Sequence, residues 1–340
     1  MKKSQRLAAV LLILLMLCGC SMPAAPNTVV LPQTPAENHT ESAPASAEPA
    51  QTTPETNAFH LEYEQTALPE PLSSVTALAM LEETLLLGGV SETGLALVRL
   101  TPEGRSEELP LPGSTEYLYA LCPDGAGGAW LLCGSLPKGY FDAFGNFRFL
   151  SQEPEGKLAL AHYDAAFALQ EIVLLQTLYT DRFFQLRRLD GGFCMMSASL
   201  LVRLDETGAE TARQSLDAKD GWSFAAMQET DGVLYALTRN FYGIELPELR
   251  KFTPDTLSAL ESDVCTSEIT GLGLRADGRL LMGNSEELFA YDTGSGETET
   301  LVRWQEIGAN VLTEQPWELE DGYLLFSPGD TSLQRLRRVP

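Results

Sequence analysis

The segment Cys122-Pro-Asp-Gly-Ala-Gly-Gly-Ala-Trp-Leu-Leu-Cys-Gly-Ser135 joins two short apolar runs through a glycine-rich turn. Its glycines could cradle a phosphate, and its two cysteines could bind a metal or form a disulfide. A phosphate-binding glycine loop opens a helix, but the apolar run that begins at Ala129 is no helix start. Asp-Gly is favoured in tight turns, because Gly adopts positive φ freely and Asp tolerates it. The segment therefore predicts a β-hairpin.

The same pattern, Asp-Gly before a short apolar run, recurs along the chain. The copies begin at Asp124, Asp190, Asp231, Asp277 and Asp321, and an earlier copy at Glu82-Glu83 lacks the Asp-Gly. Most of them lie about 40–50 residues apart, a period typical of propellers and similar arrays. Each copy has an apolar strand before the turn and another after it, then a third strand and usually a more polar fourth. Four antiparallel strands joined by tight turns form one propeller blade.

Six such units can be recognised. They begin near Val75, Tyr117, Phe183, Trp222, Ile269 and Glu314. The sixth has only three strands, whereas Leu61–Pro69 precedes the first unit at the place of a fourth strand. We therefore expect an all-β fold, a six-bladed β-propeller spanning residues 59–340. Its N-terminal strand should pair with Gln334–Val339 and close the last blade, which removes both free sheet edges.

One repeat also carries a family resemblance. Asp124-Gly-Ala-Gly-Gly-Ala-Trp130 resembles the D-x-x-G-x-x-W repeat of bacterial two-component-regulator propellers, and only this unit keeps the Trp. The resemblance implies the same propeller fold.

The N-terminus has the features of an export signal. Lys2, Lys3 and Arg6 precede the apolar run Leu7–Leu17, which is too short to span a bilayer. The sequence Leu17-Cys18-Gly19-Cys20 resembles the lipobox of bacterial lipoproteins. That resemblance implies cleavage after residue 19 and a diacylglycerol on Cys20, the predicted lipidation site. An ordinary cleaved secretory peptide is the alternative. We expect an extracytoplasmic protein, attached to the cell membrane through acyl chains at Cys20.

Residues 21–58 contain no aromatic side chain and are rich in Pro, Ala, Thr, Ser and Glu. Such a composition buries too little apolar surface to offset the entropy of ordering. We therefore divide the chain into a lipoprotein signal (1–20), a disordered tether (21–58) and the propeller (59–340).

The chain is strongly acidic, with a formal net charge of −24 at pH 7. Removal of the signal would take away three cations and no acids. This charge argues against a nucleic-acid partner, since affinity for nucleic acid depends on neutralising phosphates with Lys and Arg. It also argues against docking of the propeller on anionic lipid.

No catalytic or metal-binding pattern is visible. Cys122, Cys133, Cys194 and Cys265 match no zinc spacing. Cys122 and Cys133 are offset along their hairpin, which argues against a disulfide, and their redox state stays open. In His162-Tyr163-Asp164, adjacent strand residues point to opposite faces, so the trio cannot act as a local triad. We expect no cofactor and a protein that is not an enzyme.

The aromatic residues of two long loops are the candidate binding face. One loop is the insert 135–157, the other is 239–245, and Trp222 and Tyr179 fall in inter-blade connections that reach the same face of a propeller. The candidate residues are Tyr140, Phe144, Phe147, Trp222, Phe241 and Tyr242. Exposed aromatics on long loops suggest recognition of a glycan, a peptide or a protein. The alternative is that the insert forms its own hairpin with its aromatics packed inward.

The layout resembles the N-terminal propeller part of Gram-positive solute-binding lipoproteins. That resemblance implies a cell-surface binding or scaffolding module, accessory to an ABC-type importer, although we expect no α/β binding domain after the propeller. The first alternative is a lactonase-like enzyme with a divalent metal held by channel Glu, Asn and Asp side chains. The second is an envelope assembly factor, against which the count of six blades argues, because the assembly propeller has eight.

Overall fold

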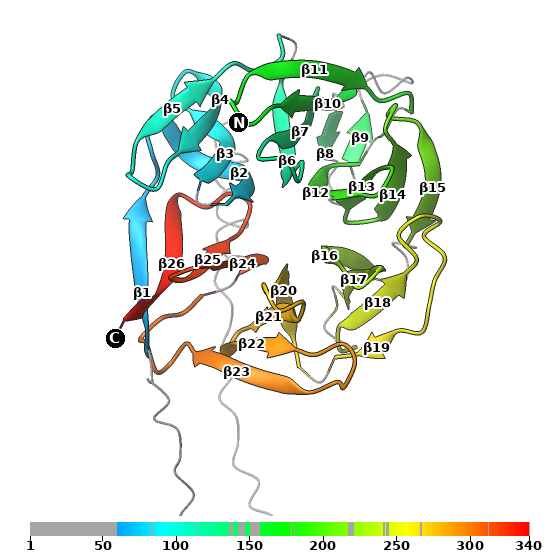
Figure 1. Cartoon of the computed structure of the whole chain (residues 1–340). Helices are drawn as coiled ribbons and strands as arrows, with labels where there is room; N and C mark the ends of the chain where they lie inside the picture. Colours follow the sequence, from blue (N-terminus) through cyan, green and yellow to red (C-terminus); the bar gives the residue numbers. More distant parts are fainter. Residues whose placement is uncertain are drawn as a thin grey trace, which may run out of the picture. The chain divides into compact units, whose positions relative to one another are not determined.

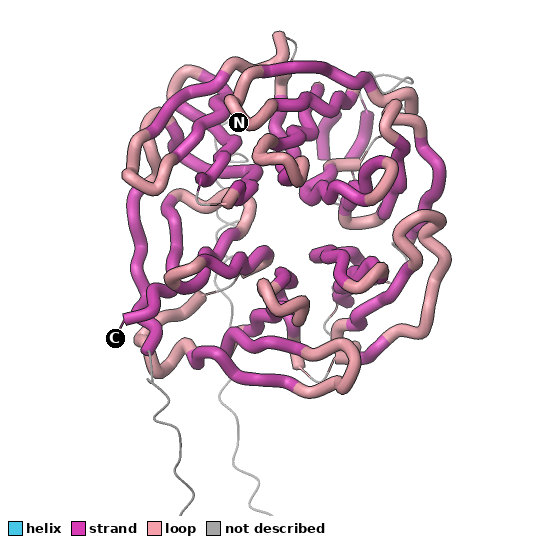
Figure 2. Tube along the Cα trace, in the orientation of Figure 1, coloured by secondary structure: helices cyan, strands magenta, loops and turns pink. Residues whose placement is uncertain are grey.

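The computed structural model describes residues 60–339 except 83, 114, 136–138, 142–146, 150–156, 178, 180, 217–220, 241, 243–244, 266 and 312, with the backbone alone at 139–141, 147–149 and 264. All of these residues belong to one compact unit, Thr56–Pro340. Within this described part there is no helix long and apolar enough to cross a membrane. Figure 2 shows strands and loops throughout it.

Six four-stranded antiparallel sheets stand around a central axis, so the unit is an all-β, six-bladed β-propeller, as the repeats predict (Figure 1). Blade 1 contains β2 (Leu72–Leu81), β3 (Thr84–Ser91), β4 (Gly94–Leu100) and β5 (Ser106–Leu109). Blade 2 contains β6 (Tyr117–Pro123), β7 (Ala129–Gly134), β10 (Leu158–Tyr163) and β11 (Leu169–Leu174). Blade 3 contains β12 (Phe183–Leu189), β13 (Gly192–Ser197), β14 (Leu200–Asp205) and β15 (Glu210–Ser215).

Blade 4 contains β16 (Trp222–Thr230), β17 (Val233–Asn240), β18 (Glu248–Phe252) and β19 (Asp263–Val264). Blade 5 contains β20 (Ile269–Leu274), β21 (Leu280–Asn284), β22 (Glu287–Tyr291) and β23 (Thr298–Arg303). Blade 6 contains β24 (Gln315–Leu319), β25 (Gly322–Phe326), β26 (Ser332–Val339) and β1 (His60–Ala67).

The ring closes through the N-terminal strand, as predicted. β1 pairs antiparallel with β26 over eight positions, from His60↔Val339 to Ala67↔Ser332. The Tyr63 hydroxyl also donates to Gln334 Oε1 at 3.1 Å. Blade 6 is therefore built from both ends of the propeller, and Figure 1 shows the blue β1 beside the red β26.

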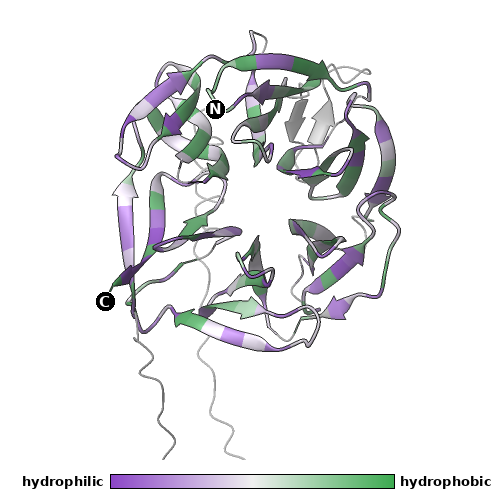
Figure 3. Ribbon diagram, in the orientation of Figure 1, coloured by the Kyte–Doolittle hydropathy of each residue, from purple (hydrophilic) through white to green (hydrophobic). Residues whose placement is uncertain are grey.

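Buried apolar side chains hold neighbouring blades together. Six clusters of them occur in the described part, and each combines residues of two adjacent blades, including blades 6 and 1. Trp304 packs between blades 5 and 6, and its indole Nε1 donates to the Asn284 carbonyl at 2.8 Å. The inner strands are mostly apolar, whereas the outer strands alternate, as the colours of Figure 3 show. Each blade thus buries both faces of its inner strands against its neighbours.

The turns after the first strands have the predicted chemistry. Gly125, Gly191, Gly232 and Gly278 all have positive φ, between 68° and 87°. In blade 1, which lacks the Asp-Gly, Glu82 adopts φ 53° at the first position of the turn, as Asp231 (φ 52°) does in blade 4. These turns define one face of the ring, which we call the turn face. The opposite face carries the inter-blade connections and the loops between second and third strands, and we call it the loop face.

Three local features differ from the pattern or add to it. The fourth strand of blade 4 is only two residues long; before it, Leu257 (φ 51°) is buried in the core and donates its N–H to Thr253 O at 3.0 Å. Tyr179 is not an exposed recognition residue. It is 3% exposed, and its hydroxyl donates to Glu210 Oε2 at 2.7 Å. The insert forms its own hairpin, in which β8 (Gly139–Phe141) pairs with β9 (Phe147–Phe149).

Candidate binding site at the channel mouth

A cavity of about 640 Å³ opens where the first strands of the blades end, at the turn-face mouth of the central channel. Side chains from all six blades line it: Met80, Pro123, Arg187, Gln228, Leu272 and Trp317 are examples. Four successive blades each place one side chain at the same level of the channel. This residue lies two positions before the last paired residue of the first strand, and in blades 3 to 6 it is Arg187, Gln228, Leu272 and Trp317. The repeated fold therefore brings them around one axis.

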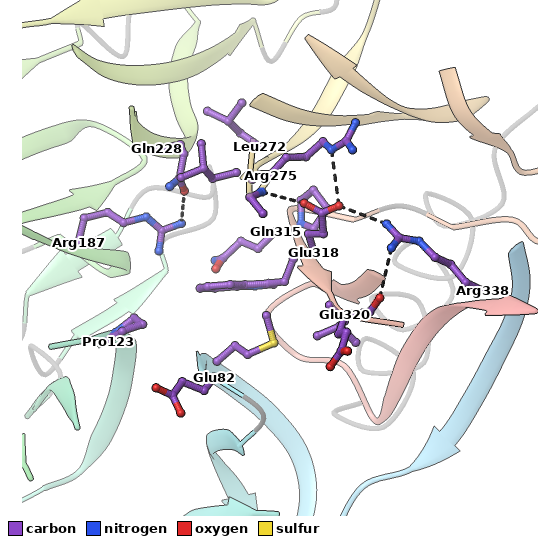
Figure 4. Close-up of a pocket in the computed structure, with 17 residues that line it drawn as sticks. Glu82, Pro123, Arg187, Gln228, Leu272, Arg275, Gln315, Glu318, Glu320 and Arg338 are labelled. Carbon is purple, nitrogen blue, oxygen red and sulfur yellow. Dashed lines mark hydrogen bonds and ion pairs between the residues drawn. The ribbon is translucent and has the colours of Figure 1, made fainter. Parts of the chain in front are cut away.

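Arg187 is the central cation of this mouth. Its Nη2 donates to Gln228 Oε1 at 2.9 Å, and its guanidinium carbon lies 5.5 Å from the centroid of the Trp317 ring. Arg187 belongs to blade 3 and Trp317 to blade 6, so this contact spans the channel between opposite blades. Figure 4 shows Arg187 reaching from one side of the cavity toward Gln228.

The Arg187 charge has no carboxylate partner among the described residues. Burial lowers the pKa of Arg187, as expected for a cation withdrawn from water. The titratable groups that act on the Arg187 charge are Cys122 and Cys194, and burial raises the pKa of each thiol to about 12. Both are therefore neutral at physiological pH. Within the described part, Arg187 Nε and Trp317 Nε1 are also buried donors without a hydrogen-bond acceptor.

On the other side of the mouth, the carboxylate of Glu318 is already paired with two arginines. Its carboxylate accepts the Ala276 N–H at 2.8 Å, and it lies 3.3 Å from Arg338 Nη2 and 3.6 Å from Arg275 Nε. Figure 4 shows Glu318 between these two arginines. Glu82 and Glu320 line the same cavity and are exposed at its rim. The mouth therefore offers one cation without a carboxylate partner in the described part of the chain, and two exposed carboxylates at its rim.

A second cavity of about 670 Å³ adjoins the first between blades 6 and 1. The two share five lining residues: Met80, Glu82, Glu318, Leu319 and Glu320. The turn face is thus hollowed from the axis outward to the closing blade.

The structure places the sequence-predicted aromatics in three groups. Tyr140 and Phe147 lie on the hairpin β8–β9, where the backbone alone is described, and Phe144 and Phe241 lie outside the described residues. Trp222 begins β16 and is half-buried, with the Arg250 guanidinium carbon 5.6 Å from its ring centroid. Tyr242 is 68% exposed. Its ring packs on the backbone of Gly221, so the structure brings Trp222 and Tyr242 together on the loop face of blade 4.

The motif around Asp124 has a structural role. Asp124 Oδ1 accepts the N–H groups of Ala126 and Gly128, while Oδ2 lies 2.9 Å from His162 Nε2. The His162 ring stacks on Trp130 with centroids 4.4 Å apart. Burial alone would raise the pKa of Asp124, but the hydrogen bonds from His162 and the turn outweigh it and lower the pKa. Asp, Gly and Trp in this repeat thus fix the hairpin to the third strand.

All four cysteines of the propeller are free thiols. Cys133 pairs with Leu118 and Cys122 with Trp130, which confirms the offset expected from the sequence. The hairpin geometry therefore keeps these two cysteines apart.

Two carboxylates gather near the loop-face mouth. Burial raises the pKa of Glu314, which Arg239 of blade 4 partly offsets, and burial also raises the pKa of Asp330. In the described part of the chain, no group of three or more His, Cys, Asp or Glu side chains could hold a metal. The lactonase-like alternative stays a prediction, which metal analysis of the purified propeller would test.

The channel residues were missed in the sequence, although a signal for them existed. Arg187 in FFQLRRL and Gln228 in WSFAAMQET are polar side chains of inner strands close to the turn, and Trp317 in QPWEL is a large aromatic side chain at the same position. Aligning the repeats by their turns would have placed all three at one level of the channel.

Comparison with known proteins defines the fold class. No protein-family model and no curated protein matches the sequence. Among solved structures, a glucose dehydrogenase is 11% identical with a TM-score of 0.50, covering 82% of this chain and 99% of that one. The soluble aldose sugar dehydrogenase from Escherichia coli in the apo-form gives the same four values. A streptogramin B lyase is 10% identical with a TM-score of 0.48, covering 82% and 98%. At such identities the two structures with a TM-score of 0.50 show the propeller fold alone, and none of the three assigns an activity.

Proposed function

We propose that the chain is a lipid-anchored, extracytoplasmic binding module that recognises a glycan, a peptide or a protein through the loop face of blade 4. The observation that supports this is the exposure of Tyr242 beside Trp222. Leu246, in the same β17–β18 connection, is 47% exposed. We call Trp222, Tyr242 and Leu246 the blade 4 patch. Large apolar side chains gathered in water on one surface usually mark an interaction site.

An accessory role beside an ABC-type importer is the setting that the lipoprotein layout suggests. The lipobox at Cys20 would fix the propeller to the outside of the membrane, and residues 21–58 would let it stand off the surface. A binding module in this position could present a solute or a partner to a membrane complex.

Replacement of Tyr242 by Ala tests the recognition proposal. A glycan and peptide array identifies ligands of the wild-type propeller, and titration of Trp222 fluorescence then measures affinity. We expect Tyr242→Ala to weaken binding about 10- to 100-fold, the usual effect of removing a central aromatic anchor. The matched control is Leu174→Ala, because Leu174 is 64% exposed but lies on the outer strand β11. Equal affinity of the two variants would refute the patch as the site.

Replacement of Cys20 by Ala tests the anchor. We expect the variant to incorporate no labelled fatty acid and to leave the membrane fraction, because only a cysteine directly after the cleavage site receives the diacylglycerol. Cys18→Ala is the control and should keep both the label and the membrane location. Label that persists in Cys20→Ala would rule out this anchoring site.

A further inference from the structure

The channel mouth on the turn face has the chemistry of a second binding site, independent of the blade 4 patch on the opposite face. Its cation, Arg187, is withdrawn from water without a carboxylate partner in the described part of the chain. Such a charge is costly unless an anion or several acceptors face it. The Gln228 oxygen accepts from Arg187 Nη2 and the Leu186 carbonyl accepts from Nη1 at a long 3.5 Å, so Nε is the guanidinium nitrogen without an acceptor among the described residues. The amide NH₂ of Gln228 is a further donor. An anionic group at this point would find an unused cation.

The carboxylates at the rim of the cavity further restrict the class of ligand that can bind there. Glu82 and Glu320 line the same cavity, and no ion pair of either is formed within the described residues. Glu318, in contrast, is held by two arginines and a backbone N–H. A purely anionic ligand would meet repulsion from the rim and from a chain of net charge −24. A ligand with a carboxylate at one end and an ammonium at the other complements both groups.

The cavity walls suit a partly apolar body between those two ends. Met80, Pro123, Leu272 and Leu319 line it, and the Trp317 ring faces Arg187 across the channel. A volume of about 640 Å³ exceeds what one amino acid fills, and small-molecule sites commonly span about 300–1,000 Å³. The walls therefore admit a residue with a large side chain or a short peptide.

We propose that the turn-face mouth of the channel binds a zwitterionic amino acid or short peptide. The carboxylate faces Arg187 and Gln228, the ammonium faces Glu82 and Glu320, and the apolar body lies against Trp317. This inference rests on the channel residues alone.

Calorimetric titration of the purified propeller with phenylalanine and with leucyl-leucine tests the proposal and separates the two sources of the zwitterion. Phenylalanine amide, which lacks the carboxylate, should show no binding, and N-acetylphenylalanine, which lacks the ammonium, should bind more weakly. Failure of both zwitterions to bind at millimolar concentration, or equal binding of the two blocked forms, would overturn the proposal.

Variants connect the binding to the named residues. Arg187→Gln should weaken binding of the zwitterion about 10- to 100-fold, because a charge-assisted hydrogen bond is lost. Arg303→Gln removes the same charge from an exposed side chain of β23 and should leave affinity unchanged. Tyr242→Ala should also leave the affinity for the zwitterion unchanged, because Tyr242 lies on the opposite face. A failed test of the blade 4 patch can therefore be told apart from a failed test of the channel mouth.

A second variant covers the case in which Arg187→Gln does not fold. Glu82 and Glu320 are exposed, so the double variant Glu82→Gln, Glu320→Gln should keep the fold. It should weaken binding of phenylalanine about twofold to fivefold, the range for exposed charge pairs, and leave N-acetylphenylalanine unaffected. Unchanged binding of both ligands would contradict the assigned orientation.

Discussion

Deletion of Leu61–Pro69 is expected to lower the melting temperature of the propeller by about 10 °C or more. The deletion removes nearly all of β1 and leaves the β26 edge unpaired. It also uncovers the apolar layer between blades 5 and 6, on which Leu61 and Tyr63 pack. We estimate a loss of about 5 kcal/mol from lost burial and hydrogen bonds. For a domain of this size, each kcal/mol corresponds to about 2–4 °C.

Differential scanning calorimetry measures this effect, and deletion of residues 21–58 is its control. The tether composition predicts that this deletion leaves the melting temperature nearly unchanged. If the two deletion variants melted at the same temperature, the proposal that the N-terminal strand stabilises the ring by closing it would be refuted.

Replacement of Gly273 by Ala should also destabilise the ring strongly. Gly273 lies on β20, the inner strand of blade 5, and a Cβ there would stand 1.9 Å from the Pro316 carbonyl oxygen of β24. No flexible side chain can yield at this contact, because the obstacle is backbone. The two inner strands must separate, at a cost of about 3–5 kcal/mol, equivalent to a fall of about 6–20 °C in melting temperature.

Gly113→Ala is the matched control for this variant. A Cβ at Gly113 meets nothing within 4 Å, and its backbone is not in the left-handed region. Its melting temperature should stay within about 1–2 °C of the wild type. Because Gly273 also lines the channel mouth, Gly273→Ala should alter zwitterion binding as well. A melting temperature equal to that of Gly113→Ala would show that blades 5 and 6 are not in the contact described.

Local turn chemistry made the architecture predictable. Asp-Gly at Asp124, Asp231 and Asp277 fixes where a first strand ends and a second begins, and the apolar runs on either side define the blade. Closure was predictable as well, because Leu61–Pro69 aligns with the fourth strand that precedes blade 2. Leu257 was not, because a buried leucine with positive φ depends on the tertiary packing around it rather than on its neighbours in sequence.

The channel site was harder to foresee for a geometric reason. Arg187 and Trp317 lie 130 positions apart in opposite blades, and the repeat pattern describes only contacts within a blade and between neighbours. Aligning the repeats gives the level of each side chain along the axis, but whether the two side chains meet also depends on the diameter of the ring. For Tyr179, the sequence placed the inter-blade connection correctly, but the side chain was expected to be exposed and is instead buried against Phe183.

Closure of the ring by its two ends also imposes an order on folding. β1 is made first, but Tyr63 finds Gln334 only after a further 271 residues have followed. Bringing such distant segments together carries a loop-closure entropy that the intervening blades must reduce by stacking first. Until then β1 stays without its partner strand, and the growing array has open edges that invite pairing with other chains. Among the strands of the propeller, β26 is synthesised last, and the ring can close only after this strand has been made.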